Sequence, residues 1–596
     1  MPTSFSPRDL QLVALEGFDR LKRYRAAYAM FIREYVGKYY EAEKGTTGEE
    51  PLNLIFNTIR AIVPTLVMKN PANDVITDFV DYRNYAFLLA KGLDITQRRL
   101  RLAQTLRAGL VDAFMGMAIF KTGIAESGQL LYIDDVHVDP GALYCDLVSL
   151  DNLCIDPTCT DWDGAAFIGD RIRVPRQILL NTDGYDHDLV RQLPKSGTPR
   201  DEQGVKLLSQ KSTGTTHMEQ EMDYVDIVEL WVPDANTIVT IPDPATVIVD
   251  DYIAIRDFYG PKDGPYTRLA LTQPVPHNPL PVAPVSIWID LHKAGNRMFR
   301  KIMDQAERQK DIGIYDPAAI DTAEDIREAE DGEMVAGNPG SVQIVSFGGQ
   351  NQRNEAMMQQ LQIWYNYIAG NPDQLAGLAS GAETATQAQI LQGNAALSIG
   401  DMQDMMYDTT AIISRKMAWY MHHDPFLELP ITIRRTGGEV QQLWLTPEQR
   451  RGDFLDYTFR IIPKSMSRLD PQVRARRILE FMTNIVPSLA NTAMMMMQMG
   501  QEFNLPVSLT RAAEELEIGE WVQELFNDPT FVQRVQFMQQ MGPADPGKAA
   551  RQSQAIQQNG GYPMQHRIVT PAQRQRQEQQ AGVREGQQNI KAGGFA

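Results

Sequence analysis

The chain has 596 residues and a mass of 67.1 kDa, a length that allows about four domains. Its residues are 43% hydrophobic and 22% charged, a balance that excludes a wholly disordered chain. The net charge of −18 argues against a protein that coats nucleic acid, because such binding depends on neutralising phosphates with Lys and Arg.

The cysteines and the apolar runs predict a protein of a reducing, aqueous compartment. Cys145, Cys154 and Cys159 are too few for a disulfide framework. The first residues predict a charged amphipathic helix without the apolar core of a signal peptide. Since no run approaches the roughly 18 apolar residues of a membrane span, we expect no membrane partner.

The apolar pattern changes from helical spacing to strands along the chain. Residues 8–125 repeat apolar side chains at helical spacing, as at Leu10 and Ala14. Residues 128–285 carry short β-branched runs bounded by Pro, Gly, Asp or Asn. A further strand pair within 429–463 is interpreted as the return of this sheet region after an insertion. The predicted fold class is α+β.

The insertion predicts two helices around a small α/β unit. Helices are expected over 286–310 and 351–369, and strands with one acidic helix over 311–350. A glycine-rich loop, 370–385, precedes a long helical pattern that runs to about His422. After this pattern and the returning strands, the chain is predicted to be helical again and then ends in a Gln- and Gly-rich tail.

Charge is distributed unevenly over the insertion and the tail. Residues 311–347 hold nine acids and one base, whereas 286–310 hold six bases and three acids. The tail, 543–596, has seven basic and three acidic residues. A solvated helix face explains the insertion pattern, and so does contact between copies stacked in a ring.

Motifs for catalysis are incomplete. The run Gly542–Lys548 imitates a phosphate-binding loop, but it contains two prolines and is followed by Ala549 rather than Ser or Thr. Ser380 lies in GLASG and not in a GxSxG elbow. His422 and His423 end the long helical pattern, where we interpret them as cations favoured by the helix dipole. The sequence predicts no catalytic residue and no cofactor.

One group of residues contains potential ligands for zinc or for a hard cation, and a metal site there is the less favoured alternative. The spacing is irregular and includes no CxxC pair, so we expect no metal. The group comprises His137, Cys145, Cys154 and Cys159, with Asp134, Asp135 and Asp139 beside the histidine.

The order of these parts resembles the portal protein of tailed double-stranded DNA bacteriophages. NLIFNTIRAIVPTLVMKNP is similar to the family's early helix, and VDAFMGMAIFKTGI to its next helix and strand. DNLCIDPTCTDWDGAAFIGDRIRV resembles the wing, and DIVELWV matches the strand bearing Glu229 and Trp231. The resemblance covers about residues 1–540, and the order of the stretches identifies the family better than any single stretch.

The most specific stretch is GLASGAETATQAQILQGNAALSI. It is similar to the Thr-Ala-Thr motif that opens the family's long wing helix, with Thr384, Ala385 and Thr386 matching. Gln387 stands where Glu is common, which departs from the family pattern.

The resemblance implies a portal-like arrangement of parts. They are a wing (1–285), a first stem helix (286–310), a clip (311–350), a second stem helix (351–369), a tunnel loop (370–385), a long wing helix with returning wing strands (386–466), a helical crown (467–542) and a tail or barrel extension (543–596).

It also implies a function without chemistry. Family members form rings, usually dodecamers, at one capsid vertex of the virion, through which double-stranded DNA is packaged and ejected without sequence-specific binding. Implied partners are further copies of the chain, the terminase large subunit, tail or adaptor proteins, and the major capsid and scaffolding proteins. The chain would be made in the host cytoplasm and would not be an enzyme.

Candidate residues follow from this assignment. The tunnel loop contains no Lys or Arg, so it can meet DNA without adding salt-sensitive affinity. Its candidate contacts are Asn371, Asp373, Gln374, Ser380 and Glu383. The basic stem residues are Arg297, Arg300, Lys301, Arg308 and Lys310, and the clip docking surface is Asp321, Glu324, Asp325, Glu328, Glu330 and Asp331. Gly393, Ala396 and Gly400 are expected either to pack against another subunit or to bend the helix within one.

Two other function classes remain as alternatives. The chain could be another multimeric virion component, such as a head–tail adaptor or scaffold-like protein, which the helix–small unit–helix insertion argues against. An enzyme, either a nuclease or an NTPase, is opposed by the incomplete nucleotide and metal motifs.

Overall fold

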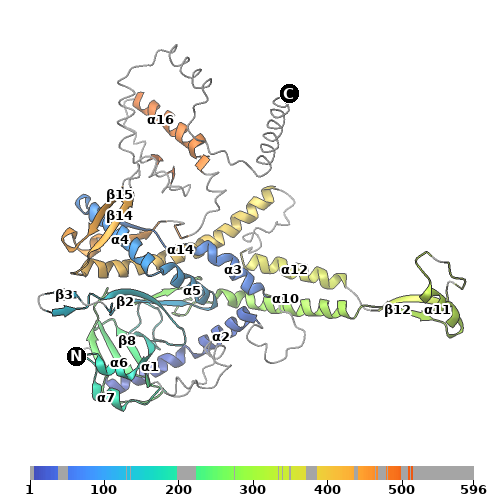
Figure 1. Ribbon diagram of the computed structural model, residues 1–596, viewed down its shortest axis with the longest axis horizontal. Helices are drawn as coiled ribbons and strands as arrows, with labels where there is room; N and C mark the ends of the chain where they lie inside the picture. The colour runs from blue at the N-terminus through green and yellow to red at the C-terminus, as the bar shows by residue number, and fades with distance from the viewer. Residues whose placement is uncertain are drawn as a thin grey trace, which may run out of the picture. The chain divides into compact units, whose positions relative to one another are not determined.

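The computed structural model describes most of the first 500 residues, in one compact unit. The described residues are 6–37, 52–128, 131–133, 136–196, 223–273, 275–332, 334–338, 340–347, 351–370, 385–434, 440–462, 465–466, 478–479, 481–498, 508–509 and 512–513. Within them the chain mixes helices with antiparallel sheets, so the predicted α+β class is confirmed (Figure 1).

The N-terminal helices lie within residues 7–115. These are α1 (Pro7–Arg20), α2 (Lys22–Val36), α3 (Leu54–Leu66), α4 (Arg83–Arg99) and α5 (Leu102–Met115). The Ser6 hydroxyl caps α1 by accepting a hydrogen bond from the backbone N–H of Asp9, and Pro7 opens the helix. Arg101, with a left-handed φ of 54°, separates α4 from α5. The predicted helical region therefore ends at Met115 rather than near residue 125.

Two antiparallel sheets follow these helices. The larger has the order β10 (Ala254–Asp257), β9 (Thr237–Pro242), β8 (Tyr224–Val232), β7 (Ile168–Pro175) and β6 (Leu153–Ile155), and the smaller has the order β11 (Tyr266–Leu269), β2 (Ala118–Ala125) and β5 (Ala142–Val148). The strands β3 (Leu131–Ile133) and β4 (Val136–Val138) form a hairpin between β2 and β5.

Alternation along β8 explains why the larger sheet has helices on both faces. Val228 and Leu230 pack with Leu10 and Phe18 of α1 in one cluster. The odd-numbered positions Val225 and Ile227 instead pack with α6 (Arg176–Asn181) and α7 (His187–Gln192) through Leu179, Val190 and Leu193. Since successive side chains of a strand point to opposite faces, one apolar strand supports both clusters.

The insertion folds largely as the sequence predicts. It contains α10 (Pro284–Glu307), β12 (Lys310–Tyr315), the short turns of η4 (Pro317–Ala319), α11 (Ile320–Glu328), β13 (Val342–Phe347) and α12 (Gln352–Ile368). The helix α14 then runs from Ala385 to His423, 39 residues or about 58 Å at 1.5 Å per residue. The first of these helices ends at Glu307, short of the predicted residue 310, because Lys310 already pairs with Phe347 in the β12–β13 hairpin.

The returning strands correct one prediction. β14 (Leu429–Arg434) pairs with β15 (Val440–Leu445), and β16 (Thr458–Ile461) pairs with β1 (Asn73–Ile76). Neither pair joins the two sheets formed by residues 118–269, so the idea of one sheet region split by an insertion is wrong. The remaining described elements are the short turns η3 (Val80–Tyr82), η5 (Pro447–Gln449) and η6 (Phe454–Asp456), the π-turn Phe481–Ile485, and α16 (Val486–Gln498).

Candidate assembly and docking surfaces

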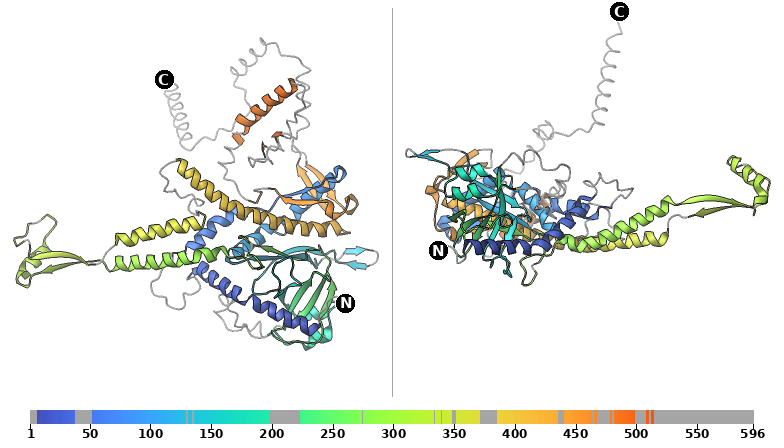
Figure 2. Two further views of the ribbon diagram at one scale, coloured as in Figure 1. Left: turned by 180° about the vertical axis from the view of Figure 1, so that it is seen from behind. Right: turned by 90° about the horizontal axis from the view of Figure 1, so that it is seen from below.

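The helices α10 and α12 lie side by side as an antiparallel pair (Figures 1 and 2). Near the start of α10, Trp288 is buried and its ring centroid lies 5.9 Å from that of Phe114. Near the end of α12, the hydroxyl of buried Tyr365 lies 2.9 Å from that of Thr58. At the other end of the pair, the Asn354 amide donates to Gln305 at 2.8 Å. One end of each helix is therefore anchored on α5 or α3, and the Asn354–Gln305 bond joins the two helices at the other end.

The basic residues expected on the first of these helices are largely exposed. Arg300 is half-buried, and the exposed ones are Arg297, Lys301, Arg308 and Lys310. They are spread over α10 and the residues that follow it. This arrangement is that of a solvated, positively charged helix surface.

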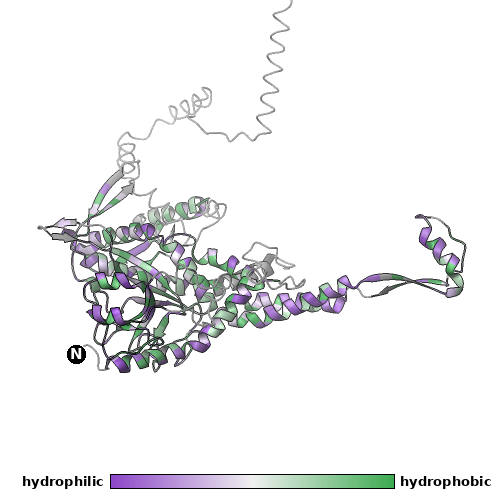
Figure 3. Ribbon diagram, turned by 60° about the horizontal axis from the view of Figure 1, so that its bottom comes forward, coloured by the Kyte–Doolittle hydropathy of each residue, from purple (hydrophilic) through white to green (hydrophobic). Residues whose placement is uncertain are grey.

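The second helix presents apolar side chains to solvent. Trp364 is 44% exposed and Tyr367 is 79% exposed, and Ile363 and Ile368 are also exposed. Only one side of α12, which includes Leu361 and Tyr365, is buried within the chain. Figure 3 shows hydrophobic and hydrophilic residues interspersed along the α10–α12 pair. Four large apolar side chains exposed within six residues of one helix make this end of α12 a candidate interaction site.

In the acidic segment, residues 311–350, the acids on α11 and just after it are exposed. Asp321, Glu324, Asp325 and Glu328 share one side of α11, at the i, i+3, i+4 and i+7 positions, and all are exposed. Glu330 and Asp331, which follow the helix, are exposed as well. Thus the structure brings the six predicted docking acids together on one short stretch.

The predicted packing glycines lie on α14, and only Gly400 has described surroundings. Gly393 and Ala396 lie within this helix, but their side-chain environments are outside the described part of the chain. A Cβ added to Gly400 meets no atom of the chain within 4 Å. Close packing inside the subunit therefore does not require a glycine at this position.

Substitutions at Gly400 separate the two expectations for this face. Gly400→Ala should stabilise the helix by about 1 kcal/mol, because Ala has the higher helix propensity. Gly400→Leu should leave the subunit folded but prevent its assembly if a second copy packs there. Circular dichroism and native mass measurement check the two effects, and normal assembly of the Leu variant would favour a role within one subunit.

His422 corrects the interpretation of the two terminal histidines as cations. It is buried, its Nδ1 lies 3.0 Å from the Tyr85 hydroxyl, and its ring contacts Phe454 and Tyr457. Burial, with the nearby charges of His423 and Arg450, lowers the pKa of His422 to about 4. His422 is therefore neutral near pH 7.

His423 interacts with the last turn of its own helix. Its Nδ1 lies 2.8 Å from the carbonyl oxygen of Trp419, one turn back, and its ring stacks on that tryptophan. The two neighbouring histidines thus differ in role because only one of them turns into the core.

A pH titration tests the burial of His422. The folded-state pKa of about 4 lies below the ordinary value of 6.5, so the unfolded chain binds the extra proton between these values. The free energy of unfolding should therefore fall as the pH drops from 6.5 to about 4. Over this range the equilibrium constant for opening should rise by up to about tenfold per pH unit. His422→Gln should remove this contribution, as hydrogen exchange of α14 at pH 7 and pH 4.5 can measure. An unchanged pH dependence in the variant would contradict the assignment.

Several predicted positions lie outside the described residues. They include the tunnel-loop candidates Asn371, Asp373, Gln374, Ser380 and Glu383, the run Gly542–Lys548, and the tail. The structure therefore leaves the expectations for these positions as predictions.

The three thiols have separate surroundings and do not converge. Cys145 accepts from the Thr122 hydroxyl, Cys154 donates to the Ala14 carbonyl, and Cys159 donates to the Asp156 carbonyl. Burial raises the pKa of both Cys145 and Cys154 to about 12, which disfavours the thiolate that zinc requires. Among the residues that the structure describes, no group of three or more His, Cys, Asp and Glu side chains could hold a metal ion.

Asp139, a candidate cation ligand, accepts hydrogen bonds from its own loop. Its carboxylate accepts hydrogen bonds from the backbone N–H groups of Ser127, Gly128 and Gly141. These bonds and that of the Ser127 hydroxyl lower the pKa of Asp139.

A buried ion cluster is the feature that sequence reasoning missed. Lys121 of β2 lies 2.7 Å from Asp170 of β7 and 2.9 Å from Glu229 of β8, so it connects the two sheets. Arg256 also contacts Glu229, and the Tyr266 hydroxyl donates to Asp170 at 2.5 Å. Burial opposes the charge of Lys121, but its interactions with Tyr266 and with the carboxylates of Glu229 and Asp170 outweigh this effect and raise the pKa of the amine.

The pKa of Glu229 is lowered in the same cluster. Burial acts against the carboxylate, and the charges of Lys121 and Arg256 overcome it. The signals in the sequence were a lysine inside the apolar run that forms β2 and a glutamate, Glu229, inside the run that forms β8. The cluster is balanced in charge and its members satisfy one another, so its role is to join the sheets.

No family model matches the chain, and a search of curated proteins finds no match. Within the described residues, none of the helices combines the length and apolar character of a membrane span.

Proposed function

We propose that this chain is the subunit of a portal ring, the channel at one capsid vertex of a tailed double-stranded DNA phage. The observation that carries the proposal is the order of parts in the insertion. An antiparallel helix pair, α10 and α12, encloses a small hairpin with one acidic helix, and a 39-residue helix follows. This order corresponds to stem helix, clip, stem helix and long wing helix in the resemblance stated above.

Exposed apolar surface supports assembly from several copies. In the single chain, α12 leaves Trp364 and Tyr367 in solvent, and the β12 strand leaves Ile312 and Ile314 exposed. A two-stranded hairpin is marginally stable by itself in water. Contact with further copies would remove this surface from water, and heterologous contacts that close give a ring.

The charge distribution supports a channel that does not retain DNA. The chain is acidic overall, and each Lys or Arg placed against phosphate would add salt-sensitive affinity that slows passage. In this proposal the protein performs no chemistry, and the energy for packaging comes from a docked terminase motor.

Native mass measurement of the purified chain tests the proposal. We expect one dominant assembly of about twelve subunits, the usual number in the family. A chain that remains monomeric or dimeric at high concentration would contradict the proposal.

A further inference from the structure

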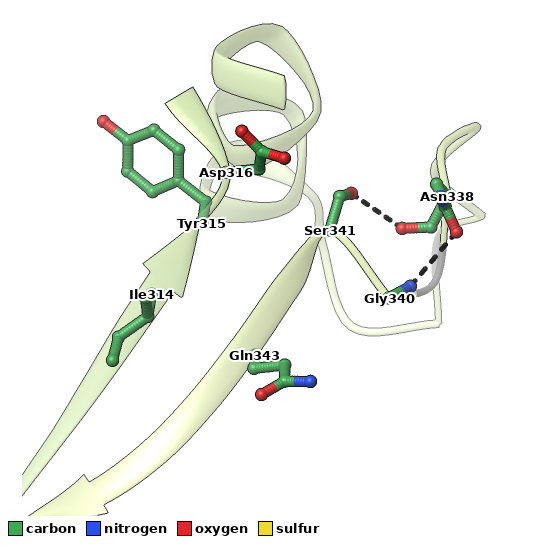
Figure 4. A pocket seen from close by; sticks show the side chains of 7 residues that line it. All are labelled: Ile314, Tyr315, Asp316, Asn338, Gly340, Ser341 and Gln343. Carbon is green, nitrogen blue, oxygen red and sulfur yellow. Dashed lines mark hydrogen bonds between the residues drawn. The ribbon is translucent and has the colours of Figure 1, made fainter. Parts of the chain in front are cut away.

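A pocket of about 570 Å³ opens on the acidic segment, where β12 ends and β13 begins (Figure 4). Ile314 pairs with Gln343, and the backbone N–H of Asp316 donates to the carbonyl of Ser341 at 2.9 Å. Asp316 directly follows β12 and Ser341 directly precedes β13, and these four side chains line the pocket together with Tyr315.

The turn before β13 forms the second wall of the pocket. The Asn338 side-chain oxygen accepts from the N–H of Gly340 at 3.3 Å, and the Ser341 hydroxyl donates to the Asn338 carbonyl at 2.7 Å (Figure 4). These two bonds fix the turn beside the strands. The pocket is therefore bounded by backbone that the hairpin already holds in place.

The lining offers hydrogen-bond acceptors and one full negative charge. Asp316 accepts from the N–H of Ala318 through Oδ1, which caps the short turn η4. Among the described residues, no Lys, Arg or His lies within ion-pair distance of this carboxylate, and no basic side chain lines the pocket. The amides of Asn338 and Gln343 supply further oxygen acceptors.

The surrounding charge selects the sign of the ligand. The segment 311–347 carries nine acids against one base, and the exposed carboxylates of α11 belong to the same small unit. Phosphates and DNA are repelled by this field, whereas a cationic side chain is attracted. A planar guanidinium can donate to a carboxylate and an amide oxygen together, and its apolar stem can pack on Ile314, which a compact ammonium does less well.

We propose that this pocket binds an arginine side chain of a partner protein that docks on the acidic segment. The inference rests on the proposed function, in which this segment is the docking surface of the ring. It adds a position, the Asp316 carboxylate, and a chemistry, a guanidinium held by the ends of β12 and β13.

Fluorescence anisotropy of a labelled tetra-arginine peptide with the full-length protein tests the pocket. Asp316→Asn keeps the oxygen that caps η4 but removes the charge, so we expect about tenfold weaker binding. The matched control is Asp325→Asn on α11, which removes the same charge outside the pocket and should change binding less than about twofold. Tetra-lysine should bind more weakly than tetra-arginine.

The outcomes distinguish the pocket from the ring. Equal losses in the two variants would show a diffuse charge effect and overturn the pocket, as would no binding of tetra-arginine by the wild type. Selective loss in Asp316→Asn supports the pocket even in a chain that native mass measurement shows to be monomeric, in which case the ring proposal alone fails. Rings that bind the peptide without dependence on Asp316 would overturn the pocket alone.

Discussion

Lys121→Met should destabilise the contact between the two sheets by about 3–5 kcal/mol, because it leaves two buried carboxylates without their shared cation. The side chains of Lys121, Asp170 and Glu229 are 11%, 10% and 17% exposed, so water can replace little of the lost interaction. Hydrogen exchange of the amides in β2, β7 and β8 measures the effect as lost protection. Among the partners that the described residues provide, Asp170 would keep the Tyr266 hydroxyl and Glu229 the more exposed Arg256.

The matched control for this prediction is Arg191→Met. It breaks an ion pair of similar length, 2.8 Å to Asp188, in which the two side chains are 63% and 83% exposed. An exposed pair contributes about 1 kcal/mol or less, so exchange in the sheets should hardly change. Similar small effects in both variants would show that the buried cluster does not stabilise the contact.

The double variant Trp364→Lys with Tyr367→Lys should lose the assembled ring while each subunit remains folded. Tyr367 is 79% exposed and Trp364 is 44% exposed in the single chain, so most of the packing that the changes remove is that of one side of Trp364. In a ring the same contact recurs between all neighbours, and each copy would have to bury two charges. We expect at least a tenfold rise in the concentration needed for assembly, measured by sedimentation.

Leu455→Lys provides the control for a general effect of surface charge. Leu455 lies in η6 and is 90% exposed, so the same type of change is made outside the α10–α12 pair. Its assembly should match that of the wild type. Unaltered assembly of the double variant, with circular dichroism like that of the wild type, would remove α12 from the subunit contact.

The spacing of apolar residues predicts much of the insertion, because its helices and its hairpin form between residues that are close in the sequence. Apolar spacing predicts α10 and α12 to within a few residues, and Asn351 caps α12 by accepting from the N–H of Arg353. The β-branched runs on either side of the acidic helix predict β12 and β13, which pair with each other.

The pairing of strands that are far apart in the sequence cannot be predicted from the local spacing of apolar residues. Val75 of β1 pairs with Phe459 of β16, and a strand of four residues after Pro71 gives little period to detect. In β15 the glutamines at 441 and 442 obscure the alternation. The neutral state of His422 likewise depends on rings supplied by α4 and by residues after 450, which no spacing within α14 reveals.

Negative-stain electron microscopy of the purified chain tests the central claim, which is that its copies close around a channel. The account predicts end-on class averages that show closed rings with a stain-filled centre and one rotational symmetry. Solid discs, open filaments or particles without rotational symmetry would contradict it.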